Sequence, residues 1–226
     1  MGEIILMSDP KVAAVPLREC GERLVDVRCS GQLLIAGRRR DRTGAFAYLR
    51  ERVSERLLEA QQRLPDGLRL LFVEGFRPPA LQRHYFDQYA ASLCAAHPHW
   101  SAQQVRSAAS RYVSPPEIAP HSAGAAVDLT LTDSEGRELD LGTRLNANPE
   151  ESAGACYTDA DNISDEARAH RRTLGTALTA AGLVNYPTEW WHWSFGDRYW
   201  ALVTESDAAL YGPQECAPDH NPQDLA

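Results

Sequence analysis

The stretch AVDLTLTD, residues 126–133, does most to limit the folds that this chain can adopt. Its apolar residues alternate with polar ones, so that Val127, Leu129 and Leu131 share one side and Asp128 lies on the other. Successive side chains of a β-strand point to opposite faces of its sheet. The pattern therefore predicts a sheet that packs one face on an apolar core and presents a carboxylate on the other face.

Helical and extended patterns are mixed along the rest of the chain without strict alternation. Apolar spacing and capping residues predict helices over residues 45–63, 80–95, 101–112 and 164–182. Short strands with turn residues between them are predicted at 23–27, 32–37, 68–75, 126–133, 191–195 and 198–203. This mixture favours an α+β fold with a mostly antiparallel central sheet flanked by helices.

The length is typical of one well-buried domain. We expect a single domain over residues 1–226, with its core at about 20–205 and a loosely ordered tail at 212–226.

The balance of charge bears on possible partners. Lys and Arg number 23 and Asp and Glu number 31, which gives a net charge of −8. Nucleic-acid binders usually present a basic face; the one basic run, GRRRDR at 37–42, is interpreted as a solvated turn. The sequence shows neither a signal-peptide pattern nor an apolar run of about 18 residues. We expect a cytoplasmic protein that binds neither nucleic acid nor a membrane.

The five cysteines are widely spaced and form no CxxC pair, so they do not indicate a zinc knuckle or a redox motif. We interpret them as reduced thiols. A disulfide between Cys20 and Cys29 in an oxidising compartment is the alternative.

The segment TEWWHWSFGDRYWA, residues 188–201, holds four of the five tryptophans together with Glu189 and His192. Residues three apart point to opposite faces of a flat strand, so these two can act together only if the chain bends between them. Pro187 just upstream is consistent with such a bend. Regular alternation would place Trp190 on the His192 side, where it could contact a substrate. The tryptophans can be the walls of a site or simply core.

A second histidine, His121 in APHSAGAAVDLTL, ends a proline-stiffened loop just before the predicted strand that carries Asp128. Gly124 between them allows a tight turn. Together with His192 they offer two nitrogens and one oxygen, a suitable ligand set for one catalytic zinc ion. Glu189 could then act as acid and base beside the metal. Each residue taken alone also fits a structural role.

The motifs HSAGAAVDLTL, EWWHW and EGFRP together resemble those of the zinc D-alanyl-D-alanine dipeptidases, in the same order and with similar spacing. The resemblance implies that His121, Asp128 and His192 bind one zinc ion per chain. It implies that Glu189 is the catalytic acid and base. It also implies that Arg77, in the GFRP turn, stabilises the developing oxyanion, a role that suits a fixed guanidinium.

The sequence departs from this pattern at positions that bind substrate in the family. Ala119 stands where a serine is common. Glu74 and Asn146 stand where two aspartates would hold the substrate ammonium, so that one charge is kept and one is lost. Asp159 or Asp161 could supply the missing carboxylate. Zinc-dependent hydrolysis is therefore implied more strongly than the substrate.

The resemblance implies a zinc dipeptidase that hydrolyses D-alanyl-D-alanine, or a similar short D-amino-acid dipeptide, through a metal-activated water. The expected partner is thus a small dipeptide. One alternative is a D-alanyl-D-alanine carboxypeptidase acting on peptidoglycan peptides. Another, from a different class, is a catalytically inactive zinc-containing binding module.

Overall fold

The computed structural model describes residues 4–37 and 43–215. The helices are α1 Pro10–Ala14, α2 Glu51–Arg63, α3 Pro79–Ala96, α4 Ala102–Ala109, α5 Asp165–Ala180 and α6 Arg198–Val203. The strands are β1 Leu24–Asp26, β2 Leu34–Ile35, β3 Tyr48–Arg50, β4 Arg69–Glu74, β5 Ala126–Thr132, β6 Val184–Asn185 and β7 His192–Ser194. Short 3₁₀ helices are η1 Val27–Ser30, η2 Ala45–Ala47 and η3 His121–Ala123.

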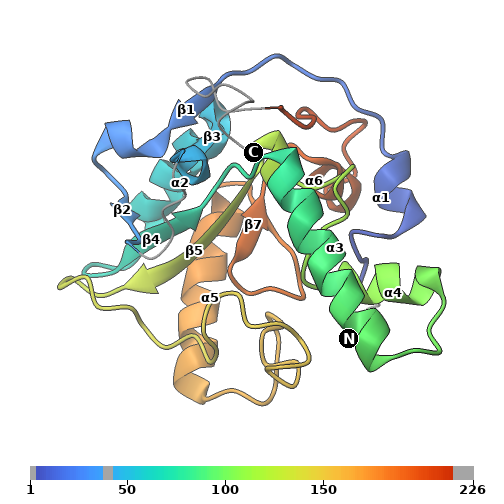
Figure 1. The fold of residues 1–226 in the computed structure, drawn as a ribbon. Helices are drawn as coiled ribbons and strands as arrows, with labels where there is room; N and C mark the ends of the chain where they lie inside the picture. Colours follow the sequence, from blue (N-terminus) through green and yellow to red (C-terminus); the bar gives the residue numbers. More distant parts are fainter. Residues whose placement is uncertain (1–3, 38–42, 216–226) are drawn as a thin grey trace.

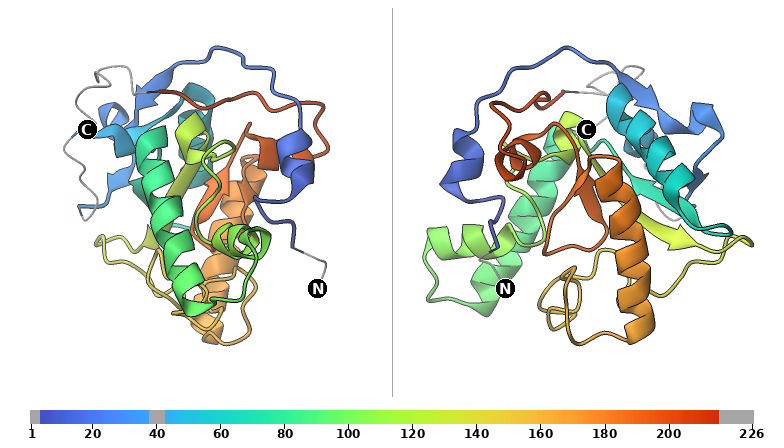
Figure 2. Two further views of the ribbon diagram at one scale, coloured as in Figure 1. Left: turned by 45° about the vertical axis from the view of Figure 1, so that its right-hand side comes forward. Right: turned by 180° about the vertical axis from the view of Figure 1, so that it is seen from behind.

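A five-stranded sheet with the order β2-β4-β5-β7-β6 forms the centre of the molecule (Figure 1). The β2–β4 pair is parallel and the other pairs of this sheet are antiparallel. Strands β1 and β3 form a separate antiparallel pair. Helices α2 and α5 lie in front of the sheet when the molecule is seen from behind, whereas α3 lies on its other side (Figure 2). The expected α+β fold with a mostly antiparallel sheet is confirmed.

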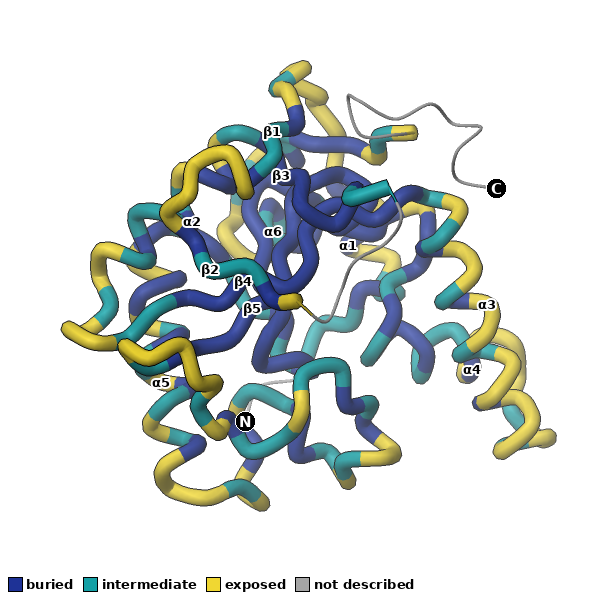
Figure 3. Tube along the Cα trace, turned by 60° about the vertical axis from the view of Figure 1, so that its left-hand side comes forward, coloured by how far each residue is buried: buried dark blue, intermediate teal, exposed yellow. Residues whose placement is uncertain are grey.

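The main core lies between the sheet and the pair α2 and α5. Val127, Leu129 and Leu131 of β5 are almost completely buried, and the same cluster includes Leu57 of α2 and Leu174 of α5. The central strands are buried along their length, and exposed residues gather on the outer helices and loops (Figure 3). The opposite face of β5 is buried as well, although it carries Asp128 and two threonines. A polar layer buried in this way needs partners inside the protein.

A β-bulge in β4 decides which of its side chains reach this polar layer. Phe72 pairs with Leu129, but Glu74 pairs with Asp128, so two steps along β4 match one step along β5. Directly opposed residues of an antiparallel pair lie on the same face of the sheet. Phe72 therefore points into the core and Glu74 lies on the Asp128 side. In an unbroken register Glu74 would share the core face with Phe72.

The helix predicted over residues 45–63 begins only at Glu51, so its first six residues were assigned wrongly. They form η2 and β3, and β3 pairs with β1 from Leu24↔Arg50 to Asp26↔Tyr48. Phe46 and Leu49 are buried as their helical spacing suggested, but Phe46 lies in the 3₁₀ helix η2 and Leu49 in β3. A pairing partner more than 20 residues away in the sequence outweighed the local helical pattern.

The strand predicted at 198–203 is wrong, because these residues form α6. The Asp197 carboxylate caps this helix by accepting hydrogen bonds from the backbone N–H groups of Tyr199 and Trp200. Helix α1, where no helix was predicted, is capped in the same way by Asp9. Aromatic and β-branched residues favoured strand in the first case, but the cap at the preceding turn determined the structure.

The N-terminal segment packs beside α6, where Met7 and Val12 are fully buried. Organisation as one domain over residues 1–226 stays a prediction. Residues 38–42 of the basic run and residues 216–226 of the expected tail lie outside the described residues. Cys20 and Cys29 are free thiols. Within the described ranges, no helix has both the length and the apolar character needed to cross a membrane.

The chain after β4 passes very close to the segment before α2. The Gly75 N–H donates to the Phe46 carbonyl at 2.7 Å, and the Phe76 N–H donates to the Tyr48 carbonyl at 2.8 Å. A Cβ atom at position 75 would lie 2.5 Å from the Tyr48 carbonyl oxygen and 2.8 Å from the Leu49 side chain. Only glycine permits this approach of one backbone to another.

We predict that Gly75→Ala lowers the free energy of unfolding by about 1–3 kcal/mol, because the added methyl group overpacks a contact made by backbone atoms. Chemical denaturation of the zinc-free protein measures this change. Gly37→Ala is the matched control, since Gly37 has ordinary φ and open space at its Cβ position. Equal stabilities of the two variants would contradict the prediction.

Candidate metal centre

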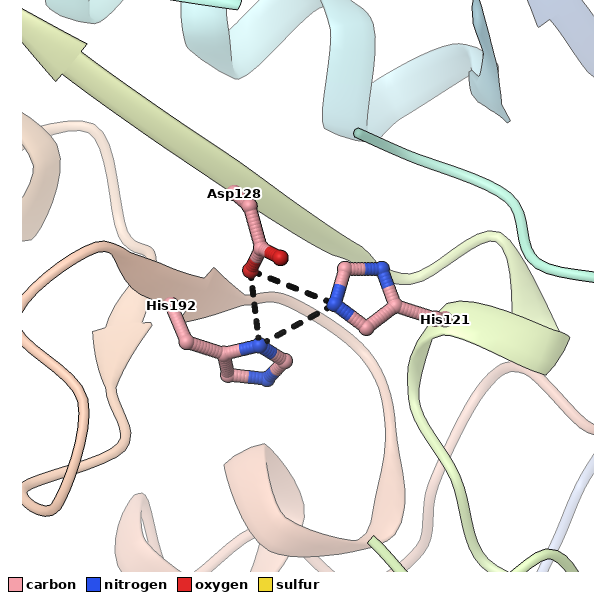
Figure 4. Close-up of side chains that lie close together, drawn as sticks. All are labelled: His121, Asp128 and His192. Atoms are coloured by element: carbon pink, nitrogen blue, oxygen red, sulfur yellow. Dashed lines mark hydrogen bonds and ion pairs between the residues drawn. The ribbon is translucent and has the colours of Figure 1, made fainter. Parts of the chain in front are cut away.

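Two strands and one tight turn bring His121, Asp128 and His192 together (Figure 4). Asp128 of β5 and His192 of β7 are directly opposed in the antiparallel register, so their side chains lie on the same face. His121 begins η3, which ends at Gly124 in a left-handed conformation with φ 65°. That turn reverses the chain into β5 and returns the His121 imidazole over the strand.

The three facing atoms form an almost equilateral triangle. His121 Nε2 lies 3.2 Å from His192 Nδ1 and 3.3 Å from Asp128 Oδ1, and the third side, from His192 Nδ1 to Asp128 Oδ1, is 3.1 Å. Tetrahedral ligands at about 2.0–2.1 Å from zinc stand about 3.3–3.4 Å from one another. Both the spacing and the donor types therefore fit a zinc ion with one further position for water or substrate.

The three residues are between 2% and 4% exposed, so their charges are poorly solvated. Burial acts to raise the pKa of Asp128, but the charges and hydrogen bonds of His121 and His192 outweigh it and hold that pKa below its ordinary value. Burial lowers the pKa of His192, with His121 acting in the same direction. An ionised carboxylate beside a neutral imidazole is the protonation state that binds a metal cation.

Three hydrogen bonds join the His121 turn to the loop that follows β4. His121 Nδ1 lies 2.6 Å from the Gly75 carbonyl oxygen, the Arg77 N–H donates to the His121 carbonyl at 3.2 Å, and the Ser122 hydroxyl donates to the Arg77 carbonyl at 2.9 Å. Since a carbonyl can only accept, Nδ1 of His121 carries the proton and Nε2 faces the metal centre. Partners of this kind orient metal-binding histidines.

The Arg77 guanidinium is held on two sides. Its Nε and Nη2 donate to the two oxygens of Glu74 at 2.8 Å each, and Nη1 donates to Gln82 Oε1 at 2.9 Å. Gln82 in turn donates to the Ser114 carbonyl at 2.7 Å. Burial acts to lower the pKa of Arg77, but Glu74 outweighs it and raises the pKa, so that the group remains charged.

Sequence reasoning missed Gln82, because a glutamine in the first turns of a helix carries no signal of what it faces. The structure also shows that Glu74, expected to grip a substrate ammonium, is engaged as the partner of Arg77.

Glu189 lies in the loop between β6 and β7. The loop closes through hydrogen bonds from Glu189 N–H to the Tyr186 carbonyl and from His192 N–H to the Glu189 carbonyl, at 2.9 and 3.1 Å. This is the bend that a cooperating Glu189 and His192 require. Burial raises the pKa of Glu189 well above its ordinary value, the Asp128 charge raises it further, and Arg77 offsets only part of this.

A small cavity of about 50 Å³ opens at these residues. Its lining consists of Arg77, Gln82, Tyr85, Tyr112, Val113, Ser114, His121, Asp128, Asn146, Glu189 and His192. Asn146 adopts a left-handed conformation with φ 62°, and its carbonyl accepts a hydrogen bond from the Tyr112 hydroxyl at 3.1 Å. The cavity thus unites the three metal-facing residues with Glu189, Arg77 and Asn146.

Other candidates from the sequence lie elsewhere. Trp190 precedes β7 in a turn rather than a regular strand, packs in the main core, and donates from Nε1 to the Thr143 hydroxyl at 2.8 Å. Asp159 and Asp161 are exposed and are absent from the cavity lining. The described residues therefore offer neither aspartate as a substitute for the charge missing at Asn146.

A buried His–Asp–His group that shares a cavity with a high-pKa glutamate and a fixed arginine defines a metal-dependent hydrolase. The chain matches the D-Ala-D-Ala dipeptidase family over residues 34–207, and it belongs to that family. It is accordingly a zinc metallopeptidase, as the sequence motifs implied.

Two relatives are similar in sequence, one over most of this chain and one over about a third of it. A D-alanyl-D-alanine dipeptidase of Synechocystis sp. is 29% identical over 219 residues, covering 83% of this chain and 87% of the relative. A D-alanyl-D-alanine dipeptidase of Escherichia coli is 35% identical over 72 residues, covering 32% of this chain and 35% of the relative.

Solved structures with partial overlap include the LdcB LD-carboxypeptidase, at 17% identity and a TM-score of 0.46, covering 85% of this chain and 76% of that one. They also include the D,D-pentapeptidase VanY in complex with Zn(II), at 18% identity and a TM-score of 0.42, covering 76% and 84%.

We predict that His121→Ala weakens zinc binding by more than about 100-fold, since loss of a direct ligand should exceed the 10–100-fold effect of losing a ligand's hydrogen-bond partner. Competition with a chromophoric chelator measures the affinity. His99→Ala, at an exposed histidine in the turn between α3 and α4, is the control and should bind zinc like the unaltered chain. A zinc affinity unchanged in His121→Ala would exclude this residue as a ligand.

A second prediction concerns the stability of the zinc-free protein. Because the folded protein raises the pKa of Glu189, its contribution to stability is complete below the pKa of free glutamate, about 4.3, and is lost as the pH rises through the folded pKa. Glu189→Gln stays neutral and should therefore unfold at higher denaturant concentration than the unaltered chain at pH 8, with the difference vanishing near pH 4. Denaturation with a chelator present checks this, and a difference independent of pH would contradict it.

Proposed function

We propose that this protein is a dipeptidase that hydrolyses D-alanyl-D-alanine or a similar short D-amino-acid dipeptide, with His121, Asp128 and His192 as the zinc ligands. The observation that carries the proposal is that Glu189 and Arg77 line the same small cavity as the three facing ligand atoms. The site thus combines a metal position, a proton carrier and a fixed cation.

When bound, zinc acts as a Lewis acid that polarises the scissile carbonyl and makes water a stronger nucleophile. Glu189 accepts the proton of the attacking water and delivers it to the departing amine. Its raised pKa suits both steps, because a general acid and base works best when its pKa lies near the working pH.

Arg77 stabilises the oxyanion that forms as the carbonyl is attacked. Glu74 and Gln82 fix its guanidinium in advance, so little reorganisation accompanies the reaction.

The size of the cavity favours a small substrate. At about 50 Å³ it is smaller than typical ligand pockets, which enclose several hundred Å³. The naming of the Synechocystis and Escherichia coli relatives as D-alanyl-D-alanine dipeptidases supports the same substrate. Action on a free dipeptide in the cytoplasm is part of the proposal.

One observation favours the carboxypeptidase alternative. Among the cavity residues that the structure describes, the carboxylates are Asp128 and Glu189, which the proposed mechanism already uses, and Asn146 is neutral. A substrate ammonium would meet amide and aromatic groups instead of a dedicated carboxylate. An acylated amine would therefore lose no ion pair, which leaves steric fit as the main discriminating factor.

We predict that the zinc-loaded enzyme cleaves free D-alanyl-D-alanine with a kcat/KM at least about tenfold above that for its N-acetylated form, because the small cavity leaves little room for an acyl group. A tenfold ratio corresponds to about 1.4 kcal/mol of transition-state stabilisation. Release of D-alanine, followed for both substrates and for the L,D and L,L dipeptides, measures it. A preference for the acetylated substrate would favour the carboxypeptidase.

Glu189→Gln is the control for the mechanism. It should retain zinc and lose about 10²–10⁴ in kcat, the usual contribution of a general acid and base. Absence of any turnover by the unaltered, zinc-loaded chain on all of these peptides would instead support the binding-module alternative.

A further inference from the structure

The two histidines of the metal centre differ in what holds their outer nitrogen. His121 faces the centre with Nε2, and its Nδ1 is paired with the Gly75 carbonyl. His192 faces the centre with Nδ1, as its contacts to His121 and Asp128 show. If Nδ1 of His192 binds zinc, its Nε2 must carry the proton, and a buried N–H needs an acceptor.

His192 Nε2 is one of three orphaned polar atoms in adjoining residues. Within the part of the chain that the structure describes, His192 Nε2, Ser194 Oγ and Asp197 Oδ2 are all buried without a hydrogen-bond partner of ordinary geometry. Ser194 lies two residues after His192 on β7 and so shares its face of the sheet. The atoms without partners are thus one donor, one hydroxyl group and one acceptor in the short segment that begins at His192.

Asp197 is close enough to interact with both other residues. The Ser194 hydroxyl and the His192 imidazole both act on its carboxyl group. Only Oδ1 of Asp197 is occupied in capping α6, through the N–H groups of Tyr199 and Trp200 at 2.8 and 3.2 Å. Oδ2 therefore remains as an acceptor on a residue already fixed by the helix.

We propose that Asp197 is a positioning residue for the metal centre. It accepts a hydrogen bond from the Ser194 hydroxyl, which in turn accepts one from His192 Nε2–H, so that the proton stays on Nε2 and Nδ1 is kept free for zinc. The chain of donors runs from His192 Nε2–H to Ser194 Oγ and from the Ser194 hydroxyl to Asp197 Oδ2. It satisfies all three orphaned atoms with one arrangement. The inference rests on the proposed assignment of His192 as a zinc ligand.

Asp197 connects helix α6 to the metal centre. The same carboxylate ends the chain of hydrogen bonds behind His192 and begins a helix on the opposite side, so the orientation of the imidazole is tied to the packing of α6 against α1 and the core. Carboxylate partners of metal-binding histidines act in this way, by fixing the tautomer and raising the basicity of the ring.

Three variants separate positioning from general stability. Asp197→Asn keeps the shape and an oxygen that can cap α6, but it turns an N–H₂ group toward Ser194 and reverses the direction of the chain. Ser194→Ala removes the bridge and leaves the cap intact. Ser164→Ala, which removes the N-cap of α5 remote from the site, is the matched control and should cost about 1 kcal/mol of stability.

Zinc affinity, measured by chelator competition, should fall about 10–100-fold in Asp197→Asn and in Ser194→Ala and stay unchanged in Ser164→Ala. Long-range ¹H–¹⁵N NMR spectra of the zinc-loaded, histidine-labelled protein should show His192 protonated at Nε2 alone. Affinities within about twofold of the unaltered chain in both site variants would overturn the proposal, as would a His192 protonated at Nδ1 in the zinc-loaded protein.

These readouts do not depend on the substrate. Failure to cleave D-alanyl-D-alanine would overturn the proposed function and leave the zinc measurements to decide the role of Asp197. Normal cleavage together with unchanged zinc affinities would overturn only the role of Asp197.

Discussion

The hydrogen bond between His121 Nδ1–H and the Gly75 carbonyl is the interaction on which the arrangement of the site depends. It joins the turn before β5 to the loop after β4, and two further bonds between Arg77 and the His121 turn tighten the same contact. One side of the contact carries a proposed zinc ligand and the other carries the proposed oxyanion-stabilising guanidinium. Neither can shift without moving the other, so their spacing is a property of the backbone.

Three neighbouring carboxylates of the site lie in different electrostatic environments. Asp128 is held ionised by two histidines, and Glu74 is paired with Arg77 through two hydrogen bonds. Glu189 is buried near Asp128 with only partial relief from Arg77, so its pKa is raised. Separation of pKa values between neighbouring acids is how one site can hold a metal and also move a proton.

Much of the fold followed from local patterns. The alternation over residues 126–133 specified β5, and Ser164 with two acids in the next turn specified α5. What could not be predicted was set by distant partners: residues 48–50 became extended because β1 pairs with them. At α6, the cap from Asp197 outweighed the strand preference of the residues that follow.

The sequence predicted the residues of the proposed site but not the contacts that hold them in place. The motifs gave the three metal-facing residues, Glu189 and Arg77, which the structure brings to one cavity, and their roles rest on the experiments above. The sequence could not show that Gln82 and Glu74 both hold Arg77, because that depends on tertiary contacts.

The bulge in β4 makes the pairing register of this strand as important as its composition. Since one extra residue stands between Phe72 and Glu74, regular pairing of the same residues with β5 would place Glu74 opposite Val127 and turn it toward the apolar core. Arg77 would then lose its carboxylate partner, and the core would gain an unpaired charge. The bulge therefore decides that Glu74 reaches Arg77, so a substitution that removed the bulge would disturb the site without altering either side chain.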